Sequence, residues 1–169
     1  GKPIIISTGM ASSDEIDDAV ETAKINGCTD LCLLKCTSTY PASPRYANVS
    51  SIETMRSKYK CEVGLSDHTL GVGVACAAIS YGASVIEKHI TLNSNEDGID
   101  SSFSMNPEEF GLLVSETNKA WESKGKVHFG ETDSEKGSRK RRRSLYFSKD
   151  LSEGTLISEA HIKRVRPGN

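Results

Sequence analysis

Two histidines carry the chemistry that the sequence suggests most directly. His68 stands in VGLSDHTLG (residues 63–71) and His89 in VIEKHITL (residues 85–92), and an acid precedes each by one or two residues. Each follows an apolar, strand-like run, and neighbouring parallel strands lie about 4.8 Å apart, so the two imidazoles could meet at one edge of a sheet. Two neutral imidazoles beside a carboxylate or water suit a divalent transition ion such as Mn²⁺ or Zn²⁺. The alternative is that each histidine only bonds backbone groups where its strand ends.

Other polar side chains also follow strand-like runs. Ser7, Ser38 and Ser66, together with backbone N–H groups, could hold a phosphate or a carboxylate, with ordinary helix capping as the alternative. Asp67 and Glu87 could orient the two histidines from behind, or be plain acids at the rim. The pattern thus indicates an anion site beside a metal site.

A long polar loop, residues 91–105, follows the second histidine. Loops of this length after a strand usually either cover a substrate or merely tolerate insertions. Asp100 in this loop is a candidate site residue, and Phe103 could anchor the loop by burying its ring.

Four apolar, β-branched runs alternate with four helical patterns, which are the elements that must position these residues. The runs are continuous rather than alternating in polarity, as expected of strands covered on both faces. A repeat of about 30 residues is the size of one strand–helix unit, so the sequence predicts a βαβαβαβα chain with a parallel sheet. The runs are residues 3–8, 30–36, 61–66 and 83–90, and the helical patterns are residues 12–27, 48–60, 70–82 and 106–125.

Two of these helices carry clear end signals. Ser12 or Ser13 should cap the first helix, and Gly27 should end it in a left-handed conformation. Asn106 should cap the last helix, with Pro107 at its first position. The third pattern is so apolar that it should be largely buried.

The fold class predicted for residues 1–125 is α/β, the C-terminal half of a TIM (β/α)8 barrel with four strand–helix units. A small doubly wound sheet is the alternative. The barrel is favoured because polar residues gather after each strand, and in barrels the chemistry lies at the C-terminal ends of the strands. The chain begins without Met in strand-like sequence and ends in KRVRPGN, so we expect it to be a piece of a longer protein.

The remaining sequence changes character. Residues 126–143 are polar and predict a linker, and residues 144–169 predict the start of a small second domain. The basic run at residues 139–143 could be a nucleic-acid or nuclear-import patch, but no aromatic residues interleave with it and a solvated hinge is favoured. The formal net charge of −2 indicates no drive toward nucleic acid or membrane.

The five cysteines form no Cys-x-x-Cys pair, which argues against a zinc ribbon. Cys32 and Cys36 sit in an apolar run, where free cysteine behaves as a small hydrophobe. This usage indicates a reducing compartment, and we expect the cytoplasm. No apolar run approaches the roughly 18 residues that a membrane span needs.

Several segments in this order resemble the sialic acid synthase family, which makes nonulosonic acids. LLKCTSTYPA and DSSFS look closest to the pseudaminic acid and spore coat polysaccharide branch, which would imply a 6-deoxy diacetamido sugar as acceptor. RRSL…KDLSEGTLI…VRPGN (residues 142–169) resembles the beginning of the family's antifreeze-like domain. The other matching segments are KPIIISTGM, VGLSDHTLG and VIEKHITL…GID.

The resemblance implies a cytoplasmic barrel enzyme that condenses phosphoenolpyruvate with the open-chain aldehyde of an N-acetylated amino sugar and releases phosphate by C–O cleavage. It implies that His68 and His89 are catalytic and bind Mn²⁺, with Mg²⁺ or Co²⁺ as alternatives, the ion acting as Lewis acid and template. It also implies a homodimer for the full-length protein. By resemblance, the phosphoenolpyruvate contacts fall on Ser7, Ser38 and Ser66, and the sugar contacts fall on Tyr40 and Asp100.

The sequence departs from the family pattern in places. Position 38 is Ser where some members have Asn, position 35 is Lys where many have His, and GID replaces the commoner Gly-Pro-Asp. The family's phosphoenolpyruvate-neutralising lysines would lie before residue 1, so we expect the 169 residues alone to be inactive. A non-catalytic metal- or sugar-binding fragment and another phosphoenolpyruvate-dependent barrel aldolase are the alternatives.

Overall fold

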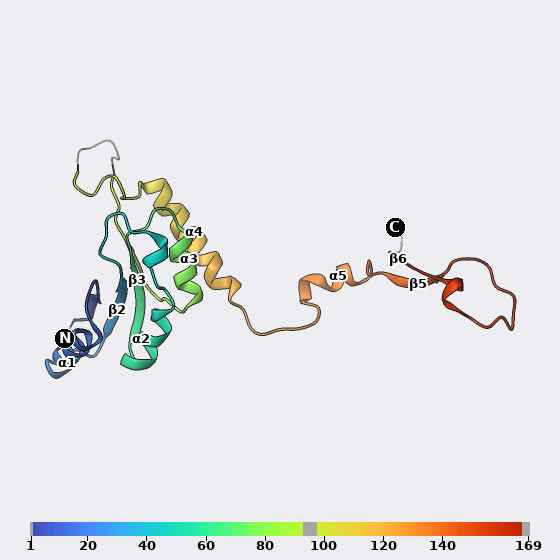
Figure 1. Cartoon of the computed structure of the whole chain (residues 1–169), viewed down its shortest axis with the longest axis horizontal. Coiled ribbons are helices and arrows are strands. Elements are labelled where there is room, and N and C mark those ends of the chain that lie inside the picture. Colours follow the sequence, from blue (N-terminus) through green and yellow to red (C-terminus); the bar gives the residue numbers. More distant parts are fainter. Residues whose placement is uncertain (1, 93–97, 167–169) are drawn as a thin grey trace. The chain divides into compact units, whose positions relative to one another are not determined.

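The computed structural model describes residues 2–92 and 98–166 of the chain. The chain divides into two units, Gly1–Gly125 and Lys126–Asn169 (Figure 1). The first unit carries a four-stranded parallel sheet and the second a two-stranded antiparallel ribbon. Within the described parts of the chain, no helix combines the length and the apolar character that crossing a membrane would require.

Strands and helices alternate along the first unit, and the strands lie in chain order across the sheet. The predicted α/β class with a parallel sheet is confirmed, because every strand pairs in parallel with its neighbour. The strands are β1 (Ile4–Ser7), β2 (Leu31–Cys36), β3 (Glu62–Asp67) and β4 (Ile86–Lys88). The helices are α1 (Ser13–Ile25), α2 (Ser51–Tyr59), α3 (Gly73–Ser80) and α4 (Pro107–Ser123), with a 3-10 turn, η1, at Pro44–Tyr46.

The ends of α1 and α4 match the predicted signals. Ser12 caps α1 in a reciprocal capping box with Glu15, and Gly27 follows the helix at φ +85°, a conformation that glycine tolerates. Asn106 caps α4 in the same way, and Pro107 is its first residue. Local chemistry therefore determines where these two helices begin.

The other two helices begin later than predicted. Asn48 has φ +46°, a left-handed conformation that an α-helix cannot contain, so α2 starts at Ser51. Before α3, the carboxylate of Asp67 accepts a 2.9 Å hydrogen bond from the Thr69 backbone N–H, and Gly71 has φ +73°. This turn delays α3, whose N-terminus receives no side-chain cap from the described residues, so capping of this helix by Ser66 is wrong.

The core lies between the helices and one face of the sheet. Leu33 and Val63, on the two central strands, are fully buried in a cluster with residues of α2. Side chains alternate along a strand, so the paired residues Leu34 and Gly64 stand on the opposite face. Ser66, two residues after Gly64, stands on that face too. The sheet thus has a helix-covered face and a second face that carries Ser66.

The outer strands are less covered than the apolar pattern predicts. Ile4 and Ile5 of β1 are 39% and 57% exposed, whereas every residue of β2 is at least half-buried. The expectation that all four runs are covered on both faces is therefore wrong for β1, because it is an outer strand of the sheet. The apolar helix α3 is also only partly buried: Ala75, Ala78 and Ile79 are its buried residues.

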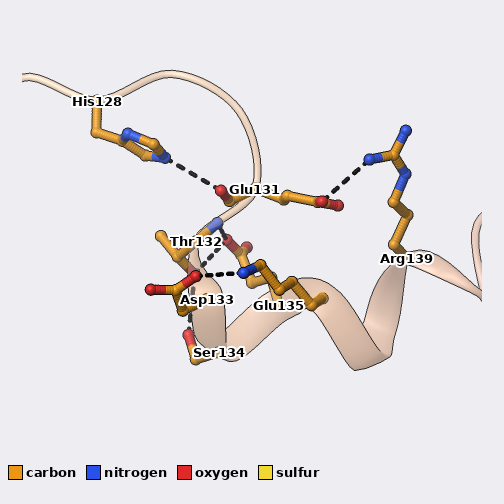
Figure 2. Close-up of polar contacts among 8 residues, drawn as sticks. His128, Glu131, Thr132, Asp133, Ser134, Glu135 and Arg139 are labelled. Atoms are coloured by element: carbon orange, nitrogen blue, oxygen red, sulfur yellow. Dashed lines mark hydrogen bonds and ion pairs between the residues drawn. The ribbon is translucent and has the colours of Figure 1, made fainter.

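The second unit pairs β5 (Ser144–Phe147) with β6 (Ile162–Val165) in antiparallel order. The predicted linker, residues 126–143, contains two short helical turns, η2 (Asp133–Glu135) and α5 (Lys136–Arg139). Figure 2 shows the contacts that stabilise them, in which the N–H and hydroxyl of Thr132 donate to the Glu135 carboxylate and Glu131 Oε1 lies 3.0 Å from Arg139 Nη1. A further 3-10 turn, η3, covers Glu159–His161.

Candidate functional site

The ends of β3 and β4 bring the two predicted histidines together. Ser66 pairs with Glu87 and Asp67 with Lys88 in the strand register, so His68 and His89 follow at the next opposing position. Their ring centroids lie 5.2 Å apart at an angle of 62°. By strand alternation both rings belong to the same face as Ser66, the face away from the helices.

His68 is 7% exposed and its ring is held by the end of β2. Its Nδ1 lies 3.0 Å from the carbonyl oxygen of Thr37. A carbonyl oxygen only accepts hydrogen bonds, so Nδ1 of a neutral His68 carries the proton and Nε2 carries the lone pair. This is the tautomer in which Nε2 can bind a metal ion.

His89 is more accessible, with a side chain that is 33% exposed. Its Nδ1 lies 3.4 Å from Oδ2 of Asp100, in the loop that follows the strand. The carboxylate would favour a proton on Nδ1 and a lone pair on Nε2, as for His68. Asp100, in the loop, therefore lies where an acid could orient His89.

Two aromatic rings enclose the histidine pair. Tyr40 lies 4.3 Å from His68 and 6.0 Å from His89 between ring centroids. Phe103 lies 5.1 Å from His89 and 5.4 Å from Tyr40, and it is 6% exposed, so it anchors the loop as predicted. These rings limit the positions that the two imidazoles can adopt.

Backbone hydrogen bonds attach the segments that carry these rings to the histidines themselves. Ala42 N–H donates to the carbonyl of His68 at 2.8 Å, and Met105 N–H donates to the carbonyl of His89 at 2.9 Å. Each histidine is thus bonded to the segment that supplies its nearest aromatic neighbour. The geometry of the pair depends on four separate stretches of the chain.

Among the contacts of the described residues, neither acid next to the histidines has a hydrogen bond to a histidine ring, so the expectation that they orient the rings by direct contact is wrong. Oδ2 of Asp67 lies 2.7 Å from Nζ of Lys88, and its Oδ1 accepts hydrogen bonds from Thr69. Glu87 accepts a 2.6 Å hydrogen bond from the Ser66 hydroxyl. Alternation explains the first result, because Asp67 and Lys88 point to the face opposite the histidines. Lys88 was missed, although a lysine directly before His89 and an aspartate directly before His68 are visible in the sequence.

The three predicted serines lie at or just beyond the C-terminal ends of three successive strands. Ser7 is the exposed last residue of β1, and Ser66 is the buried partner of Glu87. The Ser38 hydroxyl oxygen lies 3.8 Å from Sγ of Cys36. A Cβ atom at Gly9 would stand 3.0 Å from the same hydroxyl oxygen. Gly9, at φ +46°, therefore lets the segment after β1 approach Ser38 closely.

Lys35, which departs from the family pattern, lies away from the histidines. It pairs with Leu65, a member of the core cluster, so it stands on the helix side of the sheet. Its Nζ donates a 2.6 Å hydrogen bond to the carbonyl of Cys36, and burial lowers the pKa of its amine. The histidine pair does not involve this position.

The histidine pair could offer a metal ion two protein ligands. Among residues 2–92 and 98–166, no group of three or more histidine, cysteine, aspartate or glutamate side chains is arranged to hold a metal ion. Two imidazoles on one face, each with Nδ1 directed at an oxygen acceptor, remain a suitable donor set for a divalent transition ion. Substrate or water would have to complete the coordination.

Comparisons with known proteins identify relatives of this chain. The chain is 40% identical to a pseudaminic acid synthase of Campylobacter jejuni and 40% identical to an N,N'-diacetyllegionaminic acid synthase of Legionella pneumophila, over 98% of its own length and 48% of theirs. The chain therefore spans about half the length of the curated relatives that it matches.

Solved structures show the same fold. A crystal structure of an N-acetylneuraminic acid synthetase from Leptospira borgpetersenii matches with a TM-score of 0.72 at 36% identity, over 81% of this chain and 48% of that one. A spore coat polysaccharide biosynthesis protein from Bacillus subtilis matches with a TM-score of 0.70 at 28% identity, over 98% of this chain and 51% of that one. These matches confirm the parallel half-barrel. The sequence pattern of the NeuB family matches residues 1–129, which is most of the chain, so this chain belongs to the NeuB family.

Proposed function

We propose that the protein to which this chain belongs is a nonulosonic acid synthase. It condenses phosphoenolpyruvate with the open-chain aldehyde of an N-acetylated amino sugar and releases phosphate. The observation that carries the proposal is the approach of His68 and His89 to 5.2 Å at the C-terminal ends of two parallel strands, which is where barrel enzymes place their chemistry. The synthase names of the family relatives support it.

His68 and His89 are the proposed metal ligands, through Nε2 of each ring. Mn²⁺ is the proposed ion, with Mg²⁺ or Co²⁺ as alternatives. Such an ion supplies Lewis-acid polarisation of the aldehyde and a fixed positive charge. Nδ1 of each ring faces an oxygen, the carbonyl of Thr37 for His68 and the carboxylate of Asp100 for His89, and this geometry leaves Nε2 for the ion and supports the assignment.

The proposed phosphoenolpyruvate contacts are Ser7, Ser38 and Ser66. Because the Ser66 hydroxyl donates to Glu87 in this structure, it must turn away from that carboxylate before it can donate to an anion. Tyr40 and Asp100 are the proposed sugar contacts. Their side chains are about half exposed beside the histidine pair, so a ligand can reach them.

The acceptor that we propose is a 6-deoxy diacetamido sugar. The pseudaminic and N,N'-diacetyllegionaminic acid synthases among the relatives support a diacetamido class, and they are equally similar to this chain at 40% identity. An acceptor panel must therefore include the acceptors of both kinds of synthase.

We further propose that residues 144–169 begin an antifreeze-like domain, that the full-length protein is a cytoplasmic homodimer, and that it has no nucleic-acid or membrane partner. The two-stranded ribbon of β5 and β6 gives this second unit its own backbone pairing. All five cysteines are free, which suits a reducing compartment.

The test is an assay of the full-length protein with phosphoenolpyruvate and a panel of acceptors, in which phosphate release and the mass of the product are both followed. We expect a Mn²⁺-dependent C–C product with a 2,4-diacetamido-6-deoxy aldose and no product with a sugar phosphate. Metal binding without turnover would favour the non-catalytic alternative, and turnover of a sugar phosphate that lacks an N-acetyl group would favour another aldolase. The 169 residues alone should be inactive, and measurable turnover by them would overturn that part.

A further inference from the structure

A buried ion pair connects the two strands that carry the histidines. Nζ of Lys88 lies 2.7 Å from Oδ2 of Asp67, and the two side chains are 2% and 1% exposed. Lys88 also donates a 2.5 Å hydrogen bond to the carbonyl of Thr69. Oδ1 of Asp67 accepts hydrogen bonds of 2.9 and 2.8 Å from the N–H and hydroxyl of Thr69. The charges are thus paired and surrounded by further hydrogen bonds.

The pair occupies the register position directly before the histidines. Asp67 and Lys88 are paired residues of β3 and β4, and His68 and His89 are the next residues. Because side chains alternate, the ion pair lies on the helix side and the two rings on the other side. A shift of one residue between the strands would move one histidine to the wrong face and leave a buried charge without its partner.

We propose that Asp67 and Lys88 are positioning residues that set the register of β3 and β4 and thereby hold the two imidazoles at metal-binding distance. This inference rests on the proposed function only where it concerns the metal ion. The ion pair acts on the rings through the backbone, since neither Asp67 nor Lys88 has a hydrogen bond to a histidine side chain among the contacts described.

If the Asp67–Lys88 pair only stabilised the fold, replacing it would affect stability but not the geometry of the histidines. A buried ion pair can often be replaced by apolar side chains of similar size without loss of stability, because desolvation of the two charges offsets their attraction. What apolar side chains cannot replace is the one-to-one pairing of opposite charges that selects a single register. Stability and histidine geometry should therefore respond differently to such a replacement.

The experiment compares Lys88→Met, Lys88→Arg and the double variant Asp67→Leu/Lys88→Met in the full-length protein. Three quantities are measured: the thermal midpoint, the Kd for Mn²⁺ by electron paramagnetic resonance, and the nuclear Overhauser effect between the His68 and His89 ring protons. Lys58→Met is the matched control, because Lys58 also forms an ion pair, with Asp17 at 2.6 Å, but is half-exposed and belongs to helix α2 rather than to β3 or β4.

We expect Lys88→Met and the double variant to lose the inter-ring effect and to raise the Kd for Mn²⁺ at least about tenfold, in the range seen for residues that orient metal ligands. Lys88→Arg, which keeps the charge, should recover part of the affinity, and Lys58→Met should match the wild type. If Lys88→Met does not fold, the double variant decides.

A folded double variant with wild-type Kd and a wild-type inter-ring effect would overturn the proposal, because it would show that any well-packed pair suffices. Failure of the wild type to bind Mn²⁺ would instead overturn the proposed metal site. In that case the inter-ring effect still decides the role of Asp67 and Lys88.

Discussion

His68 and His89 lie at opposing positions just beyond β3 and β4, with ring centroids 5.2 Å apart. The two histidines are distant in the sequence, and the parallel pairing of β3 and β4 brings their rings together. Tyr40 and Phe103 contact the pair from two further segments. The site is therefore assembled by the tertiary structure, and each contributing segment can be tested by itself.

The two histidines should dominate binding of Mn²⁺. His68→Ala and His89→Ala each remove one of two proposed protein ligands. Loss of a residue that only orients a metal ligand weakens binding by up to about 100-fold, so we expect loss of a ligand itself to weaken it by at least about 100-fold. Titration followed by electron paramagnetic resonance measures this. The chain has four histidines, and His128→Ala and His161→Ala, in the second unit, are the controls. Unchanged binding in His68→Ala would contradict the assignment.

Asp100 should influence His89 through the ring nitrogen that it faces at 3.4 Å. Replacement by the neutral Asp100→Asn weakens the preference for a proton on Nδ1, so we expect an approximately tenfold loss of Mn²⁺ affinity. Nitrogen-15 chemical shifts of His89 report the tautomer directly. Asp18→Asn, an exposed acid of α1, is the control. An unchanged tautomer and affinity in Asp100→Asn would contradict the role of this contact.

Gly64 should be intolerant of any side chain. A Cβ atom there would overlap the carbonyl oxygen of Val85 and stand 2.7 Å from Cδ2 of Leu34, in the middle of the sheet. We expect Gly64→Ala to lower the free energy of unfolding by about 3 kcal/mol or more, at the upper end for overpacking. Urea unfolding measures it.

Gly111, by contrast, lies inside α4, where an added Cβ atom would meet no neighbouring atom within 4 Å, so it serves as the control for Gly64. Gly111→Ala should raise the free energy of unfolding by roughly 0.5–1 kcal/mol, since alanine loses less conformational entropy in a helix. Equal effects of the two substitutions would contradict this account.

Lys35 should make stability depend on alkaline pH. Burial lowers the pKa of its amine in the folded chain below the ordinary 10.5. Between the lowered pKa and 10.5, the unfolded chain therefore binds more protons than the folded one. Stability contributed by this group therefore rises as the pH rises through that window. Lys35→Met removes the effect, so the difference in unfolding free energy, wild type minus variant, should increase from about pH 7 to the ordinary pKa of 10.5. A flat or falling difference in urea unfolding would show that burial does not disfavour the charge.

The sequence predicted much of the local structure because short-range chemistry decides it. Ser12 and Asn106 sit where their side chains can cap α1 and α4, and Gly27 sits where a left-handed residue ends a helix. The predicted starts of α2 and α3 were too early, because left-handed residues, Asn48 and Gly71, precede the observed helices. Asparagine and glycine permit such turns but do not require them.

What the sequence by itself determined is the order of strand–helix units, the family, and the positions of His68 and His89 directly after two strands. The tertiary structure alone decided the partners of the polar side chains. Asp67 stands next to His68 in the chain yet pairs with Lys88 on the opposite face, and the distant Asp100 lies beside His89. The physical reason is that neighbours along a strand point to opposite faces of the sheet, so side chains meet across strands rather than along them.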